Sequence, residues 1–178
     1  GGYRYNSAKV IRVITGVYIF FTVAAALSLW AAGMTFFDAV NHAFSLAATG
    51  GFSTRNLSVG YYHSDLINIV VMIFMAVCAL HFGLVYAVFV TRSMKPMNNT
   101  VVKYYFGSIA VCSIIVAFSL MSEGGYSNWG RALMDSTFTV VSYMSTTGFA
   151  ICDNSQWPWL AGAVLIIVVK AQFLHMAE

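Results

Sequence analysis

Two short segments of the sequence carry the residue types that a dehydrated cation needs. They read Thr49-Gly50-Gly51-Phe52-Ser53 and Thr146-Thr147-Gly148-Phe149-Ala150, and both fit the pattern Thr-x-Gly-Phe-small. A monovalent cation such as potassium can exchange its water shell for the backbone carbonyls of an extended segment, and glycine leaves no side chain in the way. The aromatic residue of each segment is expected to face away from the ion and pack against the surrounding helices. The expected filter residues, which would hold K+ by their carbonyl oxygens, are Thr49, Gly50, Gly51, Phe52, Thr146, Thr147, Gly148 and Phe149.

The two segments lie in an internal repeat. A shift of 97 residues aligns 33–58 with 130–155, and seven of the 26 positions are then identical. The identical pairs are Gly33/Gly130, Asp38/Asp135, Ser45/Ser142, Thr49/Thr146, Gly51/Gly148, Phe52/Phe149 and Ser58/Ser155. Shared apolar composition would produce apolar matches, but not Asp, Ser, Thr and Gly at fixed offsets. Transport proteins are often built from internal repeats, so the pattern predicts two pore-loop units, 1–97 and 98–178, with filters at 49–53 and 146–150.

The composition and four apolar runs predict a membrane protein. Of the 178 residues, 60% are hydrophobic and only 8% are charged, whereas about a quarter of the residues of a soluble domain are charged. A helix of about 20 residues crosses the hydrocarbon core, where backbone amides must pair within the segment. The expected spans are 10–32, 66–90 and 104–122, with an incomplete span at 157–174. We expect membrane lipid around the chain, and the net charge of +3 gives no reason to expect a nucleic-acid partner.

Two further apolar stretches, 36–48 and 132–145, are too short to span a membrane. Each begins near an aspartate, Asp38 or Asp135, and ends at a cluster of Thr and Gly. Irregular backbone at membrane depth is tolerated where it lines a water-filled cavity or is buried in protein. Each stretch is therefore expected to be the pore helix of a re-entrant loop, with the negative end of its dipole toward the ion path. The expected fold class is an all-α membrane protein with repeated span, pore helix, filter loop and span units of a potassium-channel-like pore.

Basic residues gather on one side of the predicted membrane. The N-terminal region and the loop 91–103 hold six of the nine basic residues and no acidic residue. These six are Arg4, Lys9, Arg12, Arg92, Lys95 and Lys103. Because cytoplasmic loops carry an excess of Lys and Arg, the N-terminus and the loop 91–103 are predicted to be cytoplasmic, and both pore loops enter from outside.

The segments Ala48–Asn56 (ATGGFSTRN) and Ser145–Asp153 (STTGFAICD) resemble the Trk/Ktr/HKT potassium transporters, and in particular the bacterial Trk-type membrane subunit. The resemblance covers roughly residues 8–169. It implies that this chain corresponds to two adjacent repeats, the second and third, of the four that surround one pore in the family. It also implies that Gly51 and Gly148 are filter glycines, which favours potassium.

The same resemblance implies potassium uptake across the plasma (bacterial inner) membrane, with K+ as the transported ion and no covalent cofactor. The implied partners are the remaining pore-loop repeats of the same polypeptide, a second copy in a homodimer, and a cytoplasmic nucleotide-binding regulatory ring. One feature departs from the family pattern. The family has a Gly/Ser-rich intramembrane gate after the third loop, and no such interruption occurs in 157–178.

Several polar residues near the loops have more than one interpretation. Asp38 and Asp135 either attract cations to the outer mouth or lie in the first turn of each pore helix and offset its dipole; we favour the second. Asn56 and Asp153 follow each filter at the same offset and would tie the loop through side-chain to backbone bonds. Arg55 is interpreted as a surface arginine whose stem lies along apolar surface.

Other functions compete with potassium transport. The chain could be a subunit of a two-span-type cation channel, although two loops on one chain and Phe in place of the common Tyr disfavour this. It could also be a non-conducting truncated membrane fragment. An intramembrane enzyme is not expected, because no HExxH pair occurs and neither Ser53 nor Ser142 has a histidine at a spacing that would activate it. His42 receives no role, and Lys170 either faces a pore or partner or marks the end of the last helix.

Overall fold

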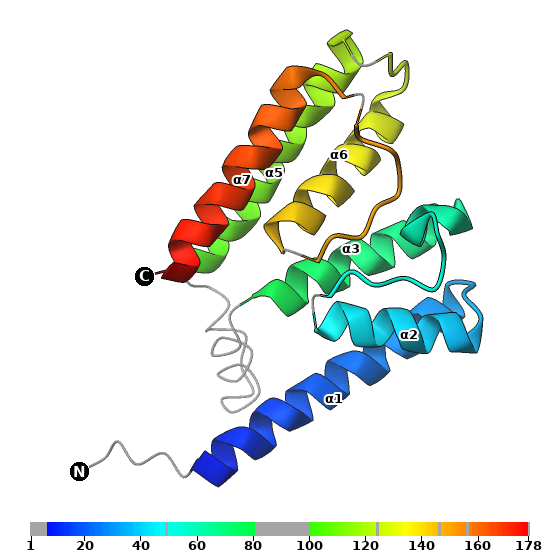
Figure 1. Ribbon diagram of the computed structural model, residues 1–178, viewed down its shortest axis with the longest axis vertical. Coiled ribbons are helices and arrows are strands. Elements are labelled where there is room, and N and C mark those ends of the chain that lie inside the picture. Colours follow the sequence, from blue (N-terminus) through cyan, green and yellow to red (C-terminus); the bar gives the residue numbers. More distant parts are fainter. Residues whose placement is uncertain are drawn as a thin grey trace.

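The computed structural model describes residues 7–48, 50–80, 100–123, 125–145, 147–155 and 157–177. Within these ranges the chain has six α-helices, one 3-10 helix and no strand (Figure 1). The elements are α1 (Ser7–Ala31), α2 (Phe36–Ala47), η1 (Ser58–Tyr62, the 3-10 helix), α3 (Asp65–Ala79), α5 (Thr100–Glu123), α6 (Trp129–Met144) and α7 (Trp159–Ala177). The all-α fold class expected from the sequence is therefore confirmed.

The first pore-loop unit starts with a helical hairpin. The 25 residues of α1 extend about 37 Å, whereas the 12 residues of α2 extend about 18 Å, so only α1 is long enough to cross a bilayer. The chain reverses at Gly33, whose φ of 120° favours glycine. The Thr35 side chain then caps α2 by accepting a hydrogen bond from the Asp38 N–H at 3.2 Å. As a result, α2 lies back along the C-terminal half of α1 (Figure 1).

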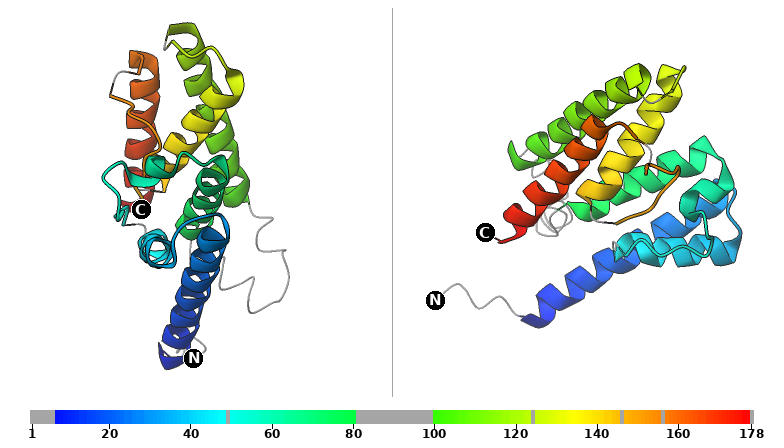
Figure 2. Two further views of the ribbon diagram at one scale, coloured as in Figure 1. Left: turned by 90° about the vertical axis from the view of Figure 1, so that its right-hand side faces the viewer. Right: turned by 45° about the horizontal axis from the view of Figure 1, so that its top comes forward.

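The second unit contains α5, α6 and α7, which lie against one another in all three views (Figure 2). The short helix α6 ends at Met144 and α2 ends at Ala47, 97 residues earlier, so the two pore helices end at equivalent positions. However, α6 begins at Trp129, three residues earlier than predicted, because the Asn128 side chain caps the helix there.

One buried core joins the two units. It contains residues of α1, α2, η1, α3 and α6, together with Phe149 from the loop after α6. Its fully buried members include Leu29, Leu46, Val59, Val71, Met75 and Phe138. A second cluster lies between α5, α6 and α7 and includes Val116, Leu120 and Val140. Helices α5 and α7 also contribute to the first cluster, through Ile109 and Val168, and α6 packs directly on α3 of the first unit.

Two helices of the described residues are long and apolar enough to cross a membrane, over Ile11–Ala31 in α1 and Val102–Glu123 in α5. The predicted span 66–90 is not one continuous helix. Helix α3 ends at Ala79, and Leu80 has an extended conformation with a ψ of 147°. Residues 81–90 lie outside the described part of the chain. An apolar run shows which residues favour lipid but does not show where a helix ends, so the sequence did not reveal this break.

The last helix passes through the predicted incomplete span at 157–174. Helix α7 begins at Trp159 and continues to Ala177. Lys170 is exposed on its surface and does not end the helix. Of the two interpretations of Lys170, the one in which the helix ends at this residue is therefore wrong.

Candidate cation-filter loops

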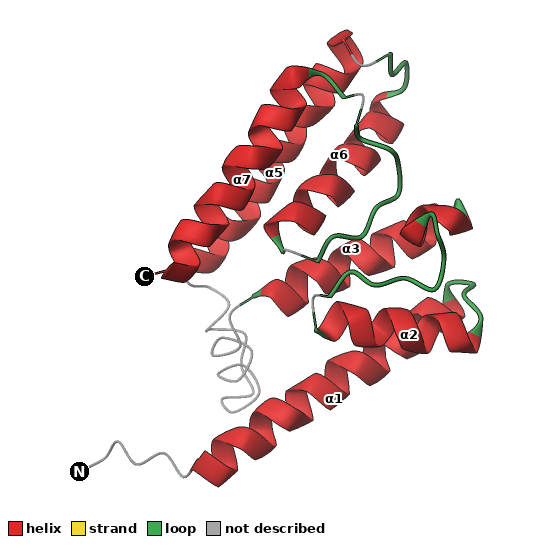
Figure 3. Ribbon diagram, viewed as in Figure 1, coloured by secondary structure: helices red, strands yellow, loops and turns green. Residues whose placement is uncertain are grey.

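Both filter loops begin with the same hydrogen bond at the end of a pore helix. The Gly50 N–H donates to the Ser45 carbonyl at 2.8 Å, and the Thr147 N–H donates to the Ser142 carbonyl at 3.1 Å. Corresponding residues in these two bonds are 97 positions apart, so the bonds are equivalent in the repeat. After them the chain leaves the helix and continues as an irregular loop in each unit (Figure 3).

A serine hydroxyl of each pore helix holds the Phe of its loop. Ser45 Oγ accepts a hydrogen bond from the Phe52 N–H at 2.6 Å. Ser142 Oγ donates to the Phe149 carbonyl at 2.7 Å. The two serines are an identical pair of the repeat, but the sequence analysis assigned them no role. A carbonyl oxygen has two lone pairs, so the Phe149 carbonyl keeps one acceptor site beyond this bond.

The predicted filter glycines adopt a conformation that favours glycine. The angle φ is 71° at Gly51 and 87° at Gly148, a region that costs other residues about 1–2 kcal/mol. A Cβ atom on Gly51 would overlap the Thr147 carbonyl oxygen, so the two loops touch at this point. The first predicted residue of each filter, Thr49 and Thr146, lies outside the described residues. The structure therefore places six of the eight predicted filter residues.

The Phe side chains of the two loops have different surroundings. Phe149 is 3% exposed and stacks on the His42 ring of α2, with ring centroids 5.6 Å apart and 27° between the ring planes. Phe52, in contrast, is 81% exposed. Phe149 therefore packs as expected, whereas Phe52 does not pack against a helix of the described residues. Among the described residues, only the second loop has the pore helix of another unit beside its Phe.

The side chain of His42 connects its own helix to both loops. It is fully buried, with Nδ1 2.7 Å from the Asp38 carbonyl oxygen and Nε2 2.8 Å from Ser53 Oγ. A carbonyl oxygen only accepts, so Nδ1 carries the proton and Nε2 accepts from the Ser53 hydroxyl. Ser53 Oγ in turn accepts from the Arg55 N–H at 3.1 Å. The expectation that Ser53 has no histidine within reach is therefore wrong, because the turn after α2 brings Ser53 back to His42. The only sequence signal for His42 was its position one turn after Asp38.

The Asp38 carboxylate binds three side chains that follow the first filter. Oδ2 accepts from the Tyr62 hydroxyl at 2.6 Å and from Arg55 Nη2 at 2.8 Å, and Oδ1 accepts from the Thr54 hydroxyl at 2.7 Å. Burial alone would raise the pKa of Asp38. The hydrogen bonds from Tyr62, Thr54 and Arg55, together with the Arg55 charge, outweigh burial and hold this pKa below its ordinary value. Asp38 lies in the first turn of α2, but its carboxylate is occupied by these partners.

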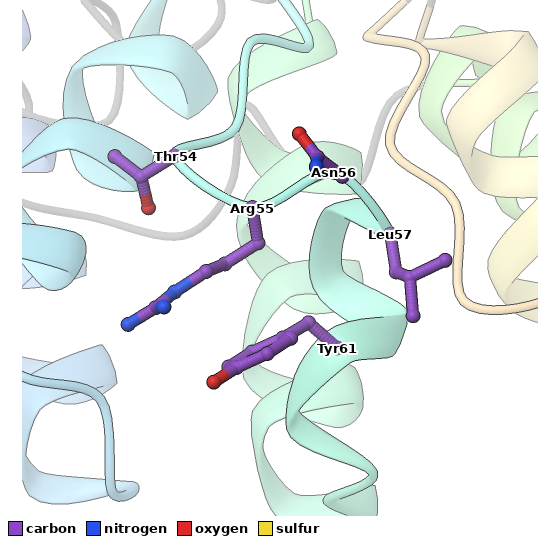
Figure 4. Close-up of a pocket in the computed structure, with 5 residues that line it drawn as sticks. All are labelled: Thr54, Arg55, Asn56, Leu57 and Tyr61. Carbon is purple, nitrogen blue, oxygen red and sulfur yellow. The ribbon is translucent and has the colours of Figure 1, made fainter.

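Arg55 is partly exposed, as the surface interpretation expects, but it also pairs with the buried Asp38, which the sequence did not predict. Its guanidinium forms two hydrogen bonds with Asp38, and its Cζ lies 4.4 Å from the centre of the Tyr61 ring. Figure 4 shows the guanidinium extended over that ring, at one side of a hollow. The hollow is lined by Thr54, Arg55, Asn56, Leu57 and Tyr61. Asp38 and Arg55 are 17 positions apart in the sequence, and no local pattern connects them.

The residues predicted to tie the outer part of each loop behave differently. Asp153 Oδ1 accepts a hydrogen bond from the Ser155 N–H at 2.9 Å. Bonds from the Ser155 hydroxyl and amide lower the pKa of Asp153. Asn56 has no corresponding bond within the described part of the chain, and its side chain points away from the Arg55 guanidinium (Figure 4).

Asp135 is held differently from Asp38. It is buried, its Oδ2 accepts from the Tyr126 hydroxyl at 2.6 Å, and Arg131 Nη2 lies 3.1 Å from its Oδ1. These partners precede Asp135 in the chain, whereas the partners of Asp38 follow it. Because α6 begins at Trp129, Asp135 lies in its second turn, and the predicted first-turn position is wrong.

The second loop also rests on η1 of the first unit. The Gly60 N–H donates to the Ala150 carbonyl at 3.0 Å, and the Ala150 N–H donates to Ser58 Oγ at 3.3 Å. A Cβ atom on Gly60 would come within 2.8 Å of the Ile151 carbonyl oxygen, so the two backbones approach closely here. The two loops are thus connected both beside the filter glycines and farther along the chain.

Comparisons with known proteins identify similar sequences. Residues 2–173 match a family model, TrkH, described as a cation transport protein. The Trk system potassium uptake protein TrkH of Escherichia coli K12 is 32% identical over 168 residues, which cover 92% of this chain and 34% of that protein. The Trk system potassium uptake protein TrkG of the same organism is 32% identical over 152 residues, which cover 85% of this chain and 31% of TrkG.

A solved structure shows the same fold. The crystal structure of the potassium transporter TrkH from Vibrio parahaemolyticus superposes with a TM-score of 0.86 at 29% sequence identity. The superposition covers 94% of this chain and 36% of that chain. This chain therefore spans about a third of the length of the proteins that it matches.

Proposed function

The chain belongs to the TrkH family of cation transport proteins, and on this basis we propose that it forms two pore-loop units of a potassium uptake pathway in the plasma (bacterial inner) membrane. The proposed units are residues 1–97 and 98–178, each with one pore helix and one filter loop. Because the family consists of transport proteins, the chain is not an enzyme.

The observation that carries this proposal is the contact between two equivalent loops. Gly51 and Gly148 occupy the same position of the repeat and share a positive φ. The α-carbon of Gly51 lies against the Thr147 carbonyl, so the first loop and the second loop meet where their backbones are irregular. Each loop follows the C-terminal end of a pore helix, and the negative end of a helix dipole favours a cation.

The proposed chemistry replaces water by peptide oxygens. A K+ ion that enters from outside gives up its hydration shell and is held by the carbonyls of 49–52 and 146–149. The segments 49–53 and 146–150 contain no Asp, Glu, Lys or Arg, so the ion meets dipoles and no fixed charge. Binding is then weak enough for release to the other side. We assign Asp38 to loop support, because Arg55 already neutralises its charge.

Two loops cannot surround an ion by themselves. Two exposed aromatic residues of the first unit indicate that further units lie beside it. Phe52 is 81% exposed, whereas its equivalent Phe149 is 3% exposed. Phe44 of α2 is 62% exposed, whereas its equivalent Val141 of α6 is 2% exposed. In the second unit these positions are covered by the first unit. We propose that other pore-loop repeats of the same polypeptide cover the equivalent face of the first unit.

The remaining partners and the orientation are proposed from the family and from the charges. We propose that the transporter is a homodimer controlled by a cytoplasmic nucleotide-binding ring. From the excess of basic residues we propose that the N-terminus and the loop 91–103 are cytoplasmic; residues 91–99 lie outside the described part of the chain. The filter loops then open to the outside of the cell.

Growth and ion flux test the proposed function. The polypeptide that carries this chain is expressed in a bacterial strain without potassium uptake systems, and growth at low potassium and rubidium uptake are measured. We expect the unmodified polypeptide to restore both, and we expect Gly51→Ser or Gly148→Asp to abolish both at unchanged abundance in the membrane. Rescue that neither substitution affects would contradict the filter. Failure of the correctly inserted polypeptide to move potassium or rubidium would contradict the function itself.

A further inference from the structure

We propose that residues of the first pore-loop unit fix the positions of both filter loops, and that Asp38 is the positioning residue that holds them. The inference rests on the proposed function, because it concerns the loops assigned there as filters. Asp38 does not contact the ion in this account. It acts through three routes, one to the first loop and two to the second.

The first route is the direct attachment of the chain just after the first filter. Asp38 accepts hydrogen bonds from Thr54 and from two nitrogens of Arg55, at 2.7, 3.2 and 2.8 Å. Hydrogen bonds between ionised groups are about twice as strong as neutral ones, and this carboxylate is 3% exposed. The exit of the first filter is therefore fixed to the start of its own pore helix.

The second route passes through His42 to the second loop. The backbone carbonyl of Asp38 accepts a hydrogen bond from Nδ1 of His42 at 2.7 Å and so orients the imidazole ring, and Asp38→Asn leaves this bond in place. The oriented ring binds Ser53 Oγ at 2.8 Å and stacks on Phe149. One side chain of the first unit thus contacts the first loop with its edge and the Phe of the second loop with its face.

The third route passes through Tyr62 and η1. The Tyr62 hydroxyl donates to Asp38 at 2.6 Å and holds the end of η1 against α2. The other residues of η1 that matter here are Ser58 and Gly60, which form the two hydrogen bonds to Ala150. The outer part of the second loop is therefore placed by an element that Asp38 anchors.

The equivalent aspartate of the second unit is connected to the first unit through Arg131, which also pairs with the exposed Asp65 of α3 and not with the first filter loop. Asp135 is bound by Tyr126 and Arg131, which precede it. The Tyr126 hydroxyl also interacts with Cys152 of the second loop. Within the ranges that the structure describes, no partner of Asp135 belongs to the first filter loop. The coupling is therefore directional, and Asp38→Asn and Asp135→Asn form a matched pair of test variants.

Amide hydrogen exchange in the purified polypeptide that carries this chain tests the inference without reference to transport. We expect Asp38→Asn to speed exchange about tenfold or more in 52–62 and also in 147–155, because charged hydrogen bonds are lost. Asp135→Asn should affect 147–155 at most and leave 52–55 unchanged. If Asp38→Asn speeds exchange in 52–62 alone, the proposal that Asp38 also positions the second loop is overturned. The proposal is also overturned if Asp135→Asn speeds amide exchange in 52–55 as much as Asp38→Asn does.

Two milder variants keep the test valid if Asp38→Asn does not fold. Tyr62→Phe and Tyr126→Phe each remove one hydroxyl that lies 2.6 Å from an aspartate oxygen. Tyr62→Phe should speed exchange in 58–62 and in 147–155, whereas Tyr126→Phe should leave 52–62 as in the unmodified protein. The inference fails if Tyr62→Phe speeds amide exchange in 58–62 and leaves the exchange rates in 147–155 unchanged.

The ratio of rubidium to sodium uptake distinguishes a residue that positions the filter from one that only stabilises the fold, because loss of the second kind of residue would not change this ratio. We expect Asp38→Asn to lower the ratio of rubidium to sodium uptake about tenfold at matched abundance, and Asp135→Asn to lower this ratio by a smaller factor. An unaltered ratio in Asp38→Asn would overturn the role of Asp38 in the filter while the proposed function stands. If the unmodified polypeptide transports neither ion, the proposed function fails, and the exchange results alone decide whether Asp38 positions both loops.

Discussion

Gly50 and Gly51 are neighbours in the first filter loop, and we predict different responses to the same added methyl group. An alanine at position 51 would have to adopt a φ of 71°. Its Cβ atom would also overlap the backbone carbonyl of Thr147. At Gly50 the nearest atom to a Cβ is 3.2 Å away on the Phe52 side chain, so a shift of a few tenths of an ångström in a side chain, and not in a backbone, relieves the contact. The second loop already has a larger residue, Thr147, at the position equivalent to Gly50.

The expected magnitudes follow from these contacts. The positive φ costs Gly51→Ala about 1–2 kcal/mol, and displacement of a backbone carbonyl adds about 1–3 kcal/mol. The sum is roughly 2–5 kcal/mol, because the displaced carbonyl belongs to the other loop and has no free rotation. Gly50→Ala reduces the freedom of the unfolded chain, which is worth about 0.4–1 kcal/mol, and this gain offsets a small shift of the Phe52 ring. Since 1.4 kcal/mol is a factor of ten, the native loop geometry should be at least about tenfold less populated in Gly51→Ala.

Rubidium uptake at matched membrane abundance, together with the ratio of rubidium to sodium uptake, measures the difference. We expect Gly50→Ala to stay within about twofold of the unmodified polypeptide and Gly51→Ala to lose most uptake and discrimination. Gly50→Thr, which copies the second loop, should also remain active. The reasoning is refuted if Gly50→Ala and Gly51→Ala are equally damaging, or if Gly51→Ala behaves as the unmodified protein.

Three further predictions concern the supports of the loops. Ser45→Ala removes the acceptor of the Phe52 N–H and should cost about 1–3 kcal/mol, seen as a lower melting temperature that Ser45→Thr restores; equal melting of both variants would speak against this role. Burial lowers the pKa of His42, so the folded state binds fewer protons, and stability should be full above about pH 6.5 and fall below it. His42→Gln should flatten this part of the melting profile, and an unchanged slope would exclude His42 as its source. Asp65→Asn should cost less than about 1 kcal/mol, because its ion pair with Arg131 is exposed; a larger loss in thermal unfolding would show that the pair is more than a surface contact.

The sequence could predict features that depend on residue type at a repeated position. Glycine at equivalent positions of two Thr-x-Gly-Phe segments predicted loops in which a side chain has no room, and Gly51 and Gly148 both have positive φ. The end of each pore helix was also predictable, because a Thr/Gly cluster follows an apolar run. The start of α6 was within reach too, since Asn128 is a typical N-cap residue, but the apolar pattern was read from Ala132 instead.

Contacts between distant residues could not be predicted in this way. Arg55 and Tyr62 follow Asp38 by 17 and 24 residues, and no periodic pattern connects them. The stacking of Phe149 on His42 joins residues of different units, and only the packing of α6 on the first unit brings them together. The break after Ala79 was hidden for another reason, because the residues around it are apolar on both sides and composition does not define a helix end.

The central claim is that the two loops provide peptide oxygens to one dehydrated ion. Anomalous scattering from thallium or rubidium, in crystals of the polypeptide that carries this chain, tests it most directly. The account predicts a peak between the loops, bounded by carbonyl oxygens of Gly50, Gly51, Thr147 and Gly148. Peaks confined to carboxylates such as Asp153, with no density between the loops, would contradict it.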